Sequence, residues 1–351
     1  MKIDIEGAVK ERYAKGALQK EEALCCPTSS YDPEFLKVIP KEIVEKDYGC
    51  GNPSKYLKEG DVVLDLGSGT GKFCFIASQI VGPQGKVIGI DFNSKMLTLA
   101  KRHQKEVGNR IGYHNVEFRQ GRIQDLKPLV ADESIDVIVS NCVLNLVKPE
   151  DKERLFKEMY RVLKRGGCVA ISDIVSDEDV PSDLQEDPEL WSGCISGAFR
   201  EDLFLSAFEE AGFYGIQVEY LSQDPYRTVR GIEFCSVTVT AYKGKEGPCI
   251  ERNHAVIYKG PWKQVEDDDK HVLRRGVRTA VCDKTYQIFS KKPYRDEVIL
   301  IPPRKEIPLD KAGLFDCSRP AVRDPRETKG KAYRKTMTAK AACNPEEGCC
   351  S

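Results

Sequence analysis

The chain has 351 residues, of which 40% are hydrophobic and 31% charged, so it is long enough for more than one domain. This composition is typical of a folded globular protein and argues against a disordered one. The net charge of −1 gives no global attraction to nucleic acid or anionic lipid, and no apolar run reaches the roughly 18 residues of a membrane span. We therefore expect neither a nucleic-acid partner nor a membrane partner.

The cysteine content is the unusual feature of the composition. The first residues lack the apolar core of a signal peptide, which predicts a cytoplasmic protein. Fourteen cysteines are many for a cytoplasmic chain of this size, yet too sparse for a small protein held together by disulfides. Free thiols in a reducing compartment indicate catalysis or the binding of a soft metal or metalloid, unless they are buried as small apolar side chains.

The pattern of apolar residues predicts the fold class. Residues 1–60 are expected to form a helical segment with loops around residues 24–30 and 48–53. From residue 61 strand-like runs alternate with helical stretches. The expected strands are 62–66, 86–91, 116–120, 135–140, 168–172, 215–220 and 234–242. The expected helices are 71–81, 94–107, 152–163 and 201–211. This alternation predicts an α/β domain over residues 61–245, with a doubly wound, Rossmann-like, seven-stranded sheet.

The pattern changes after the glycine- and proline-containing stretch at residues 244–248. Residues 246–317 contain short strand-like pieces at 255–259 and 297–301 and are expected to form a small C-terminal α+β domain. Residues 318–351 are basic and poor in apolar side chains, which predicts a flexible tail carrying Cys343, Cys349 and Cys350.

A glycine-rich loop marks the cofactor site. Gly67, Gly69 and Gly71 follow Asp65 at the end of the first strand, where glycines let the backbone approach a bulky ligand and a helix N-terminus offers free N–H groups. Nucleotide-binding folds share such loops, so the loop alone is weak evidence. Asp91 ends the second strand, and an acid there can accept both hydroxyls of a ribose. A plain helix cap at Asp91 is the less favoured interpretation.

The segment Asp65-Leu-Gly-Ser-Gly-Thr-Gly71 resembles the D-x-G-x-G-x-G signature of class I S-adenosylmethionine methyltransferases more than a dinucleotide G-x-G-x-x-G. The resemblance implies S-adenosylmethionine as cofactor. It places the adenine after strand three and the methionyl end at strand four. The implied cofactor-binding residues are Asp65, Gly67, Gly69, Gly71, Asp91, Phe92, Met96, Arg122, Ile123 and Asn141.

Thiols rather than histidines are expected at the strand ends. Methyltransferases acting on oxygen or nitrogen often use a base such as histidine, but none of the four histidines falls in such a loop. Cys142 follows strand four, Cys194 lies in a loop after strand five, and Cys50 precedes strand one between two glycines. Three converging thiolates would match the pyramidal, soft As(III) centre, whose lone pair can attack the sulfonium methyl without loss of a proton. Cys74, Cys168 and Cys235 are instead expected to be buried packing residues.

Three segments extend the resemblance to a narrower family. Tyr48-Gly-Cys-Gly51, Ser140-Asn-Cys-Val-Leu-Asn-Leu146 and Leu190-Trp-Ser-Gly-Cys-Ile-Ser-Gly-Ala198 are similar to segments of arsenite methyltransferases, over roughly residues 20–245. The resemblance implies that Cys50, Cys142 and Cys194 hold arsenic. It also implies that a disulfide between the N-terminal cysteine and Cys50 returns the pentavalent product to the trivalent state. That cysteine is Cys25 or Cys26, of which we favour Cys26.

The expected enzyme is therefore an arsenite methyltransferase. Its substrate would be trivalent arsenic as a thiol adduct, and an external thiol reductant of the glutathione or thioredoxin type would restore the cysteines. We expect it to be a monomer. Two alternatives stay open: a carbon or oxygen methyltransferase of the quinone or sterol type, and a thiol-rich metalloid sensor. The tail cysteines would fit metalloid capture or an incidental tail equally well.

Overall fold

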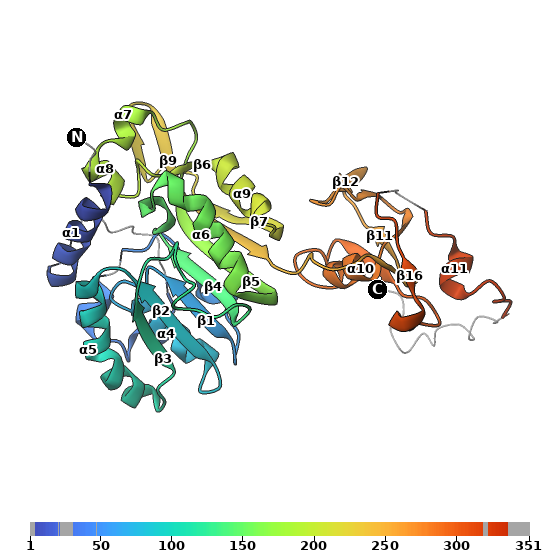
Figure 1. Cartoon of the computed structure of the whole chain (residues 1–351), viewed down its shortest axis with the longest axis horizontal. Coiled ribbons are helices and arrows are strands. Elements are labelled where there is room, and N and C mark those ends of the chain that lie inside the picture. Colours follow the sequence, from blue (N-terminus) through green and yellow to red (C-terminus); the bar gives the residue numbers. More distant parts are fainter. Residues whose placement is uncertain (1–3, 20, 22–30, 47, 319–321, 336–351) are drawn as a thin grey trace, which may run out of the picture. The chain divides into compact units, whose positions relative to one another are not determined.

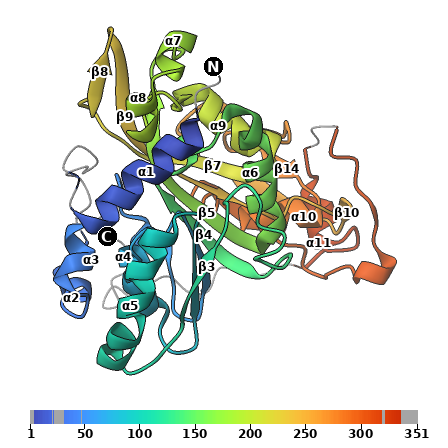
Figure 2. The same ribbon diagram turned by 60° about the vertical axis from the view of Figure 1, so that its left-hand side comes forward.

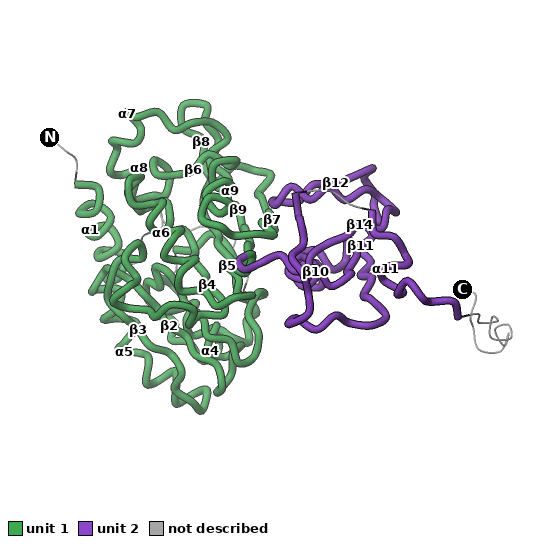
Figure 3. The backbone as a smooth tube through the Cα atoms, turned by 45° about the vertical axis from the view of Figure 1, so that its right-hand side comes forward, with its two compact units in different colours: residues 1–245 green, residues 246–351 purple. Residues whose placement is uncertain are grey.

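The structure, a computed structural model, describes residues 4–19, 21, 31–46, 48–318 and 322–335. The chain divides into two compact units, Met1–Lys245 and Glu246–Ser351 (Figure 3). Among the described helices, none is long and apolar enough to cross a membrane.

Unit 1 is built on one mixed sheet whose main path has the order β3-β2-β1-β4-β5-β9-β7 (Figure 1). The first five of these strands pair in parallel, and β9 runs antiparallel to both β5 and β7. Two short strands, β6 and β8, extend it beside β5 and β9. The strands are β1 Val62–Leu66, β2 Lys86–Asp91, β3 Val116–Gln120, β4 Ile135–Asn141, β5 Leu163–Ser176, β6 Phe199–Arg200, β7 Tyr214–Leu221, β8 Arg227–Val229 and β9 Ile232–Tyr242.

Helices cover both faces of this sheet because each buried strand is apolar on both sides. In β1, Val63 belongs to a core shared with α4 and α5, whereas its neighbour Leu64 belongs to the core on the other face, shared with α6 and α9. The helices of unit 1 are α1 Ile5–Leu18, α2 Pro33–Leu36, α3 Lys41–Glu45, α4 Lys72–Val81, α5 Ser94–Ile111, α6 Pro149–Val162, α7 Ser182–Gln185, α8 Pro188–Ser192 and α9 Glu201–Glu210, with 3₁₀ turns η2 Pro53–Tyr56 and η3 Leu144–Leu146.

The predicted elements of unit 1 are confirmed, and three of the strands match to the residue. Asn93 caps α5, because its side chain accepts a hydrogen bond of 3.0 Å from the N–H of Lys95. The main error concerns β5, which begins at Leu163 and not at Cys168. Residues 164–167 form an irregular start to this strand, in which Gly166 has φ of 81° and its N–H donates to Lys243 O at 2.7 Å.

Residues 1–60 do not form a separate domain; the described part of this segment belongs to unit 1. Figure 2 shows α1 passing between α8 and α5. Arg12 of α1 donates hydrogen bonds of 2.9 Å each to Glu189 O and Ser192 Oγ of α8. The described part of residues 1–60 is thus packed onto the rest of unit 1.

Unit 2 has its own apolar core, built by short antiparallel strands around Val256, Phe289 and Val298. The three-stranded sheet β14-β11-β15 is accompanied by the pairs β10·β16 and β12·β13. Its elements are β10 Ile250–Glu251, β11 Ala255–Tyr258, β12 Gln264–Glu266, β13 Val272–Arg274, β14 Arg278–Ala280, α10 Asp283–Phe289, β15 Val298–Ile301, η4 Leu309–Lys311, β16 Gly313–Leu314 and α11 Pro325–Lys329. This agrees with the α+β domain expected there.

The prediction of a flexible tail from residue 318 is wrong for residues 322–335. Arg323 is buried, and its guanidinium donates to both carboxylate oxygens of Glu251 at 2.8 and 2.9 Å and to Glu327 at 2.8 Å. A buried cation must be paired, so this bidentate contact fixes α11 to the body of unit 2. The tail cysteines Cys343, Cys349 and Cys350 lie outside the described residues.

Phe208 of α9 gives a stability test of unit 1. Its fully buried ring packs edge-on against Phe156 at a centroid distance of 4.8 Å and lies 5.3 Å from Phe204. We expect Phe208→Ala to lower the free energy of unfolding by about 3–5 kcal/mol, measured by denaturant unfolding followed by fluorescence of the buried Trp191. The matched control is Leu203→Ala on the same helix, where the side chain is exposed. Equal losses in the two variants would contradict this packing.

Candidate active site

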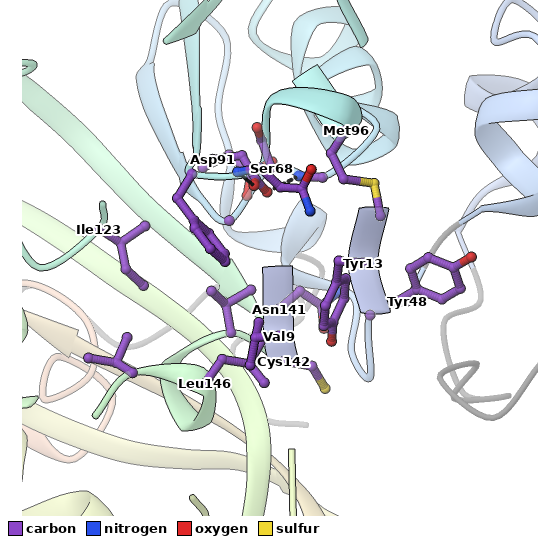
Figure 4. A pocket seen from close by; sticks show the side chains of 18 of the residues that line it. Val9, Tyr13, Tyr48, Ser68, Asp91, Met96, Ile123, Asn141, Cys142 and Leu146 are labelled. Atoms are coloured by element: carbon purple, nitrogen blue, oxygen red, sulfur yellow. Dashed lines mark hydrogen bonds between the residues drawn. The ribbon is translucent and has the colours of Figure 1, made fainter. Parts of the chain in front are cut away.

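A pocket of about 1120 Å³ opens at the carboxyl ends of the parallel strands (Figure 4). Its wall comes from the loops after β1, β2, β3 and β4, together with α1 and the segment before η2. Loops after neighbouring parallel strands meet at one sheet edge, which is where doubly wound sheets bind ligands. Nine of the ten predicted cofactor residues line it: Asp65, Gly67, Gly69, Asp91, Phe92, Met96, Arg122, Ile123 and Asn141.

Gly71 is the exception among the predicted cofactor residues. It does not line the pocket; it precedes α4 with φ of 86°, and a Cβ there would lie 2.6 Å from the ring of Phe118. Gly67 does line the pocket, with φ of 75°, and a Cβ would lie 2.4 Å from Val143. The loop therefore needs glycine at 67 for a close approach beside the pocket and at 71 for helix packing.

Asp91 is held rigidly at the floor of the pocket. Its Oδ2 accepts from the N–H of Gly69 at 2.9 Å, and its Oδ1 accepts from the N–H of Asn93 at 2.8 Å. Burial raises the pKa of this carboxyl to about 6, against the lowering effect of the two N–H donors. Each oxygen keeps a second lone pair, so the carboxylate can accept two hydroxyl groups in addition.

Apolar side chains stand beside Asp91 in the wall of the pocket. Ile123 and Met96 line the same space, as Figure 4 shows. The flat face of an aromatic base can pack against such side chains, while a carboxylate accepts hydroxyl groups. This wall therefore suits a nucleoside with a hydroxylated ribose.

Helix α1 supplies part of the wall that sequence reasoning missed. Val9 and Tyr13 face the pocket, and Glu6 forms an ion pair of 2.8 Å with Arg122, a predicted cofactor residue. Burial, followed by the nearby Cys194 thiol, raises the pKa of Tyr13 well above its usual value, so its hydroxyl stays protonated. No sequence signal pointed to these residues, because the contacts join segments more than 100 residues apart.

The structure brings Cys50, Cys142 and Cys194 together. They share one buried cluster, with exposed fractions of 1%, 4% and 5%, so water has little access to the three sulfurs. The Sγ of Cys194 donates to the backbone oxygen of Cys142 at 3.2 Å. Of the three, only Cys142 lines the pocket, where it stands between the cofactor residues and the other thiols. No residue of the pocket wall in the described part of the chain is a histidine.

Asn141 positions the Cys50 loop. Its Oδ1 accepts from the N–H groups of Cys50 at 2.6 Å and of Gly51 at 2.9 Å, and its Nδ2 donates to Gly51 O at 2.8 Å. A Cβ on Gly49 would lie 2.3 Å from the same amide, so glycine is required there. Asn141 was predicted as a cofactor contact. It lines the pocket and also holds the thiol loop against the end of β4.

Two of the three cysteines, Cys142 and Cys194, have an uncommon backbone conformation. Cys142 and Cys194 have φ of 58° and 62°, a left-handed conformation that few residues other than glycine adopt. Asp173 holds the Cys142 turn, because its Oδ2 accepts from the N–H groups of Val143 at 3.1 Å and Leu144 at 2.8 Å. Such conformations persist where surrounding contacts impose them and cluster at functional sites.

The disulfide in the structure differs from the one that the resemblance implied. Cys50 is bonded to Cys142, with a Cα–Cα distance of 5.9 Å, and not to an N-terminal cysteine. The loop held by Asn141 brings these two sulfurs together. Cys25 and Cys26 lie outside the described residues, so their pairing with Cys50 stays a prediction.

The other cysteines and one histidine also differ in part from expectation. Cys74 is buried as predicted, whereas Cys168 and Cys235 are only half-buried. His103 was expected to face solvent, but its ring nitrogens lie 3.2 Å from Glu42 and 3.0 Å from Glu106. Neither difference adds a group to the pocket.

The sheet order, the glycine loop and the buried Asp91 define a class I S-adenosylmethionine-dependent methyltransferase. A family model described as a methyltransferase domain matches residues 57–212, and one described as a domain of unknown function matches residues 245–333. The chain belongs to the arsenite methyltransferase family, and it methylates arsenite with S-adenosylmethionine as the methyl donor.

Three relatives illustrate the extent of the similarity. The arsenite methyltransferase of Aquipseudomonas alcaligenes is 35% identical over 286 residues, covering 76% of this chain and 81% of that protein. That of Mus musculus is 30% identical over 313 residues, covering 85% and 82%. The crystal structure of an arsenic(III) S-adenosylmethionine methyltransferase from Chlamydomonas reinhardtii matches with a TM-score of 0.57 and 26% identity, over 83% of this chain and 98% of that one.

The similarity to a quinone methyltransferase covers a smaller part of this chain. The demethylmenaquinone methyltransferase of Lactobacillus johnsonii is 38% identical over 115 residues, which is 33% of this chain. The quinone-type alternative therefore has less support than arsenite methylation.

Gly51 tests the placement of the thiol loop. A Cβ at this position would lie 2.2 Å from Ser172 Oγ, which is itself hydrogen-bonded to Thr238 at 2.8 Å, so Gly51→Ala must displace the loop that carries Cys50. Because misplacement of a reacting group by about 1 Å can cost 100-fold in rate, we expect arsenite methylation to fall by about that factor. Gly51 itself does not line the pocket, so the affinity for S-adenosylmethionine should fall much less than the rate. The control is Gly313→Ala, where a Cβ meets nothing within 4 Å. Full activity in Gly51→Ala would contradict the role of this close approach.

Proposed function

We propose that Cys50, Cys142 and Cys194 are the residues that hold trivalent arsenic while it is methylated. The observation that carries the proposal is their common buried cluster, with Cys142 shared between that cluster and the cofactor pocket. Thiolates are the ligands that a soft acceptor prefers, and three of them satisfy a three-coordinate centre. S-adenosylmethionine supplies an electrophilic methyl group on a sulfonium sulfur when it is bound.

The residues of the pocket would bind and orient rather than move a proton. The lone pair of trivalent arsenic forms the new As–C bond as the S–C bond breaks, so arsenic passes from the trivalent to the pentavalent state and no proton is lost. This fits a pocket wall without a histidine. Holding arsenic on Cys142 next to the cofactor residues would contribute to the rate mainly through proximity and exclusion of water.

The proposal requires an external thiol reductant. The bond between Cys50 and Cys142 must be opened before both sulfurs can bind arsenic, which takes two electrons and two protons. Two molecules of a monothiol such as glutathione, or one dithiol protein of the thioredoxin type, supply them and become a disulfide. The cytoplasm keeps such thiols reduced, and we place the enzyme there, acting as a monomer on a thiol adduct of arsenite.

The same cysteines can return pentavalent arsenic to the trivalent state. Two thiolates transfer an electron pair to arsenic as the As–S bonds break and one S–S bond forms. We propose Cys50 as one partner, with Cys26 or Cys142 as the other. A single turnover without reductant, followed by peptide mass spectrometry, identifies which disulfide accumulates.

The test of the whole proposal mixes the full-length protein with S-adenosylmethionine, arsenite and glutathione, and looks for methylated arsenic by chromatography coupled to elemental mass spectrometry. Protein that is reduced beforehand and then freed of thiol should stop after the first equivalent, and protein with the bond between Cys50 and Cys142 intact should form no product. Product formed equally well by a protein in which Cys142 and Cys194 are both serine would refute the assignment of the arsenic site. Arsenite that binds without ever being methylated would instead indicate a metalloid-binding protein.

A further inference from the structure

Three cysteines of unit 2 lie close together although they are far apart in sequence. The sulfur atoms of Cys249, Cys282 and Cys317 all lie within 4.8 Å of one another. The sequence separations are 33 residues (282 − 249) and 35 residues (317 − 282), so no local motif signals this cluster. We call it the unit 2 thiol cluster.

Each thiol is brought in by a different piece of the fold. Cys249 precedes β10, and its backbone oxygen accepts from the N–H of Phe315 at 2.9 Å, which brings the chain around Cys317 beside it. Cys282 precedes α10, and its sulfur accepts from the N–H of Thr285 at 3.4 Å. Cys282 is buried and the other two are half-buried, so the cluster sits just below the surface of unit 2. A small solute can reach it.

These cysteines are not part of the apolar core of unit 2. That core is formed by Val256, Tyr258, Leu273, Val281, Phe289 and Val298, and none of the three thiols belongs to it or to the half-buried side chains around it. Free cysteines that serve as small apolar packing residues would be expected within such a core. The geometry instead resembles a set of ligands.

We propose that Cys249, Cys282 and Cys317 form a second binding site for trivalent arsenic, within unit 2 and made only of thiols. Among the described residues, no histidine or carboxylate joins the three sulfurs as a fourth ligand. Structural zinc sites almost always have four ligands, whereas trivalent arsenic needs three. Asp283, which follows Cys282 in the chain, is already paired with Arg252 at 2.9 Å.

The binding step balances with the three thiols alone. Arsenous acid carries three hydroxyl groups, one for each thiol of the cluster. Three As–O bonds break, three As–S bonds form, and each thiol proton leaves with a hydroxide as water, with arsenic trivalent throughout. Binding at this site therefore consumes no electrons and releases no net protons.

The test counts arsenic bound to the full-length protein, kept reduced with a phosphine and dialysed against arsenite without S-adenosylmethionine. We expect Cys249→Ser and Cys317→Ser each to lose one equivalent of arsenic per chain relative to the wild type. The matched control is Cys235→Ser, a half-buried free cysteine of unit 1, which should lose none. Methylation by Cys249→Ser and Cys317→Ser reports that unit 1 is still folded.

Two further variants separate the sites. The double variant Cys142→Ser/Cys194→Ser should still bind arsenic at the unit 2 thiol cluster, and X-ray absorption spectroscopy should show three sulfur neighbours for that arsenic. This result does not depend on the assignment of the methylation site. A variant with serine at positions 343, 349 and 350 should also keep the arsenic bound at the unit 2 thiol cluster.

Each contrary result overturns the second site. The second site is refuted if Cys249→Ser and Cys317→Ser both bind as many arsenic atoms per chain as the wild type. It is also refuted if only the variant with serine at positions 343, 349 and 350 binds one arsenic atom fewer. A zinc ion that binds to the unit 2 thiol cluster in stoichiometric amount and is not displaced by arsenite would identify the cluster as a zinc site.

Discussion

Cys142→Ser is expected to abolish methylation of every trivalent arsenic substrate, with a loss of at least about 1000-fold in kcat/KM. Cys142 is the only one of the three clustered cysteines that lines the cofactor pocket, so its sulfur is the ligand through which arsenic would face the methyl group. A serine hydroxyl is a hard, protonated ligand that cannot replace a thiolate on a soft centre. The measurement is initial rates with arsenite and with monomethylarsenite under saturating S-adenosylmethionine.

The remaining cysteines should behave differently in the same assay. Cys194→Ser should match Cys142→Ser. Cys50→Ser and Cys26→Ser should lose activity on arsenite but keep it on the monomethylated trivalent substrate, which carries one methyl group and needs one thiolate fewer. Cys168→Ser, a half-buried cysteine on β5, is the control and should be fully active. Full methylation activity in Cys142→Ser, with intact cofactor binding, would refute the assignment of Cys142 as an arsenic ligand.

The parts of the fold that were predictable are those determined by local sequence. β1 and β2 are short apolar runs that are followed by glycine or end on a polar residue, and β3 alternates apolar and polar residues. The bounds of these three strands were predicted to the residue. The position of Asp91 in the pocket wall could be predicted because it depends only on the place of this residue at the end of β2 beside the glycine loop. These features need no knowledge of which distant segments touch.

The parts that escaped prediction depend on contacts between distant segments. The role of α1 rests on Arg12 meeting α8 across 177 residues and on Glu6 meeting Arg122 across 116 residues. Gly71 was assigned to the cofactor from its spacing, yet its requirement for glycine comes from Phe118 on another strand. The unit 2 thiol cluster likewise joins residues that no short pattern connects. Periodicity predicts which face of an element is buried, but it does not predict which element covers that face.

Asp91→Asn is the second variant with a large expected effect, in this case on the cofactor. The carboxylate would accept both ribose hydroxyls. Asparagine keeps one acceptor oxygen, so one hydrogen bond to a charged group is lost; such a bond contributes about 1.5–3 kcal/mol, and we expect the Kd for S-adenosylmethionine to rise about 10- to 150-fold. Isothermal titration calorimetry checks this. The control is Asp125→Asn in the loop after β3, an exposed carboxyl outside the pocket wall.

The pH dependence identifies the group responsible. Because burial raises the pKa of Asp91 to about 6, the wild type should lose cofactor affinity as pH falls below about 6, where the carboxyl takes up a proton. The free energy of unfolding should change with pH in the opposite direction to the cofactor affinity. Because the folded state favours the protonated carboxyl, Asp91 lowers the free energy of unfolding as pH rises from its usual pKa of 3.8 through about 6. Burial also raises the pKa of Asp173 to about 6, but Asp173 supports the Cys142 turn and does not line the pocket. A flat affinity profile between pH 5 and 8 in Asp91→Asn, beside a falling one in the wild type, would assign the effect to Asp91; the same fall in both would assign it to Asp173 or another group.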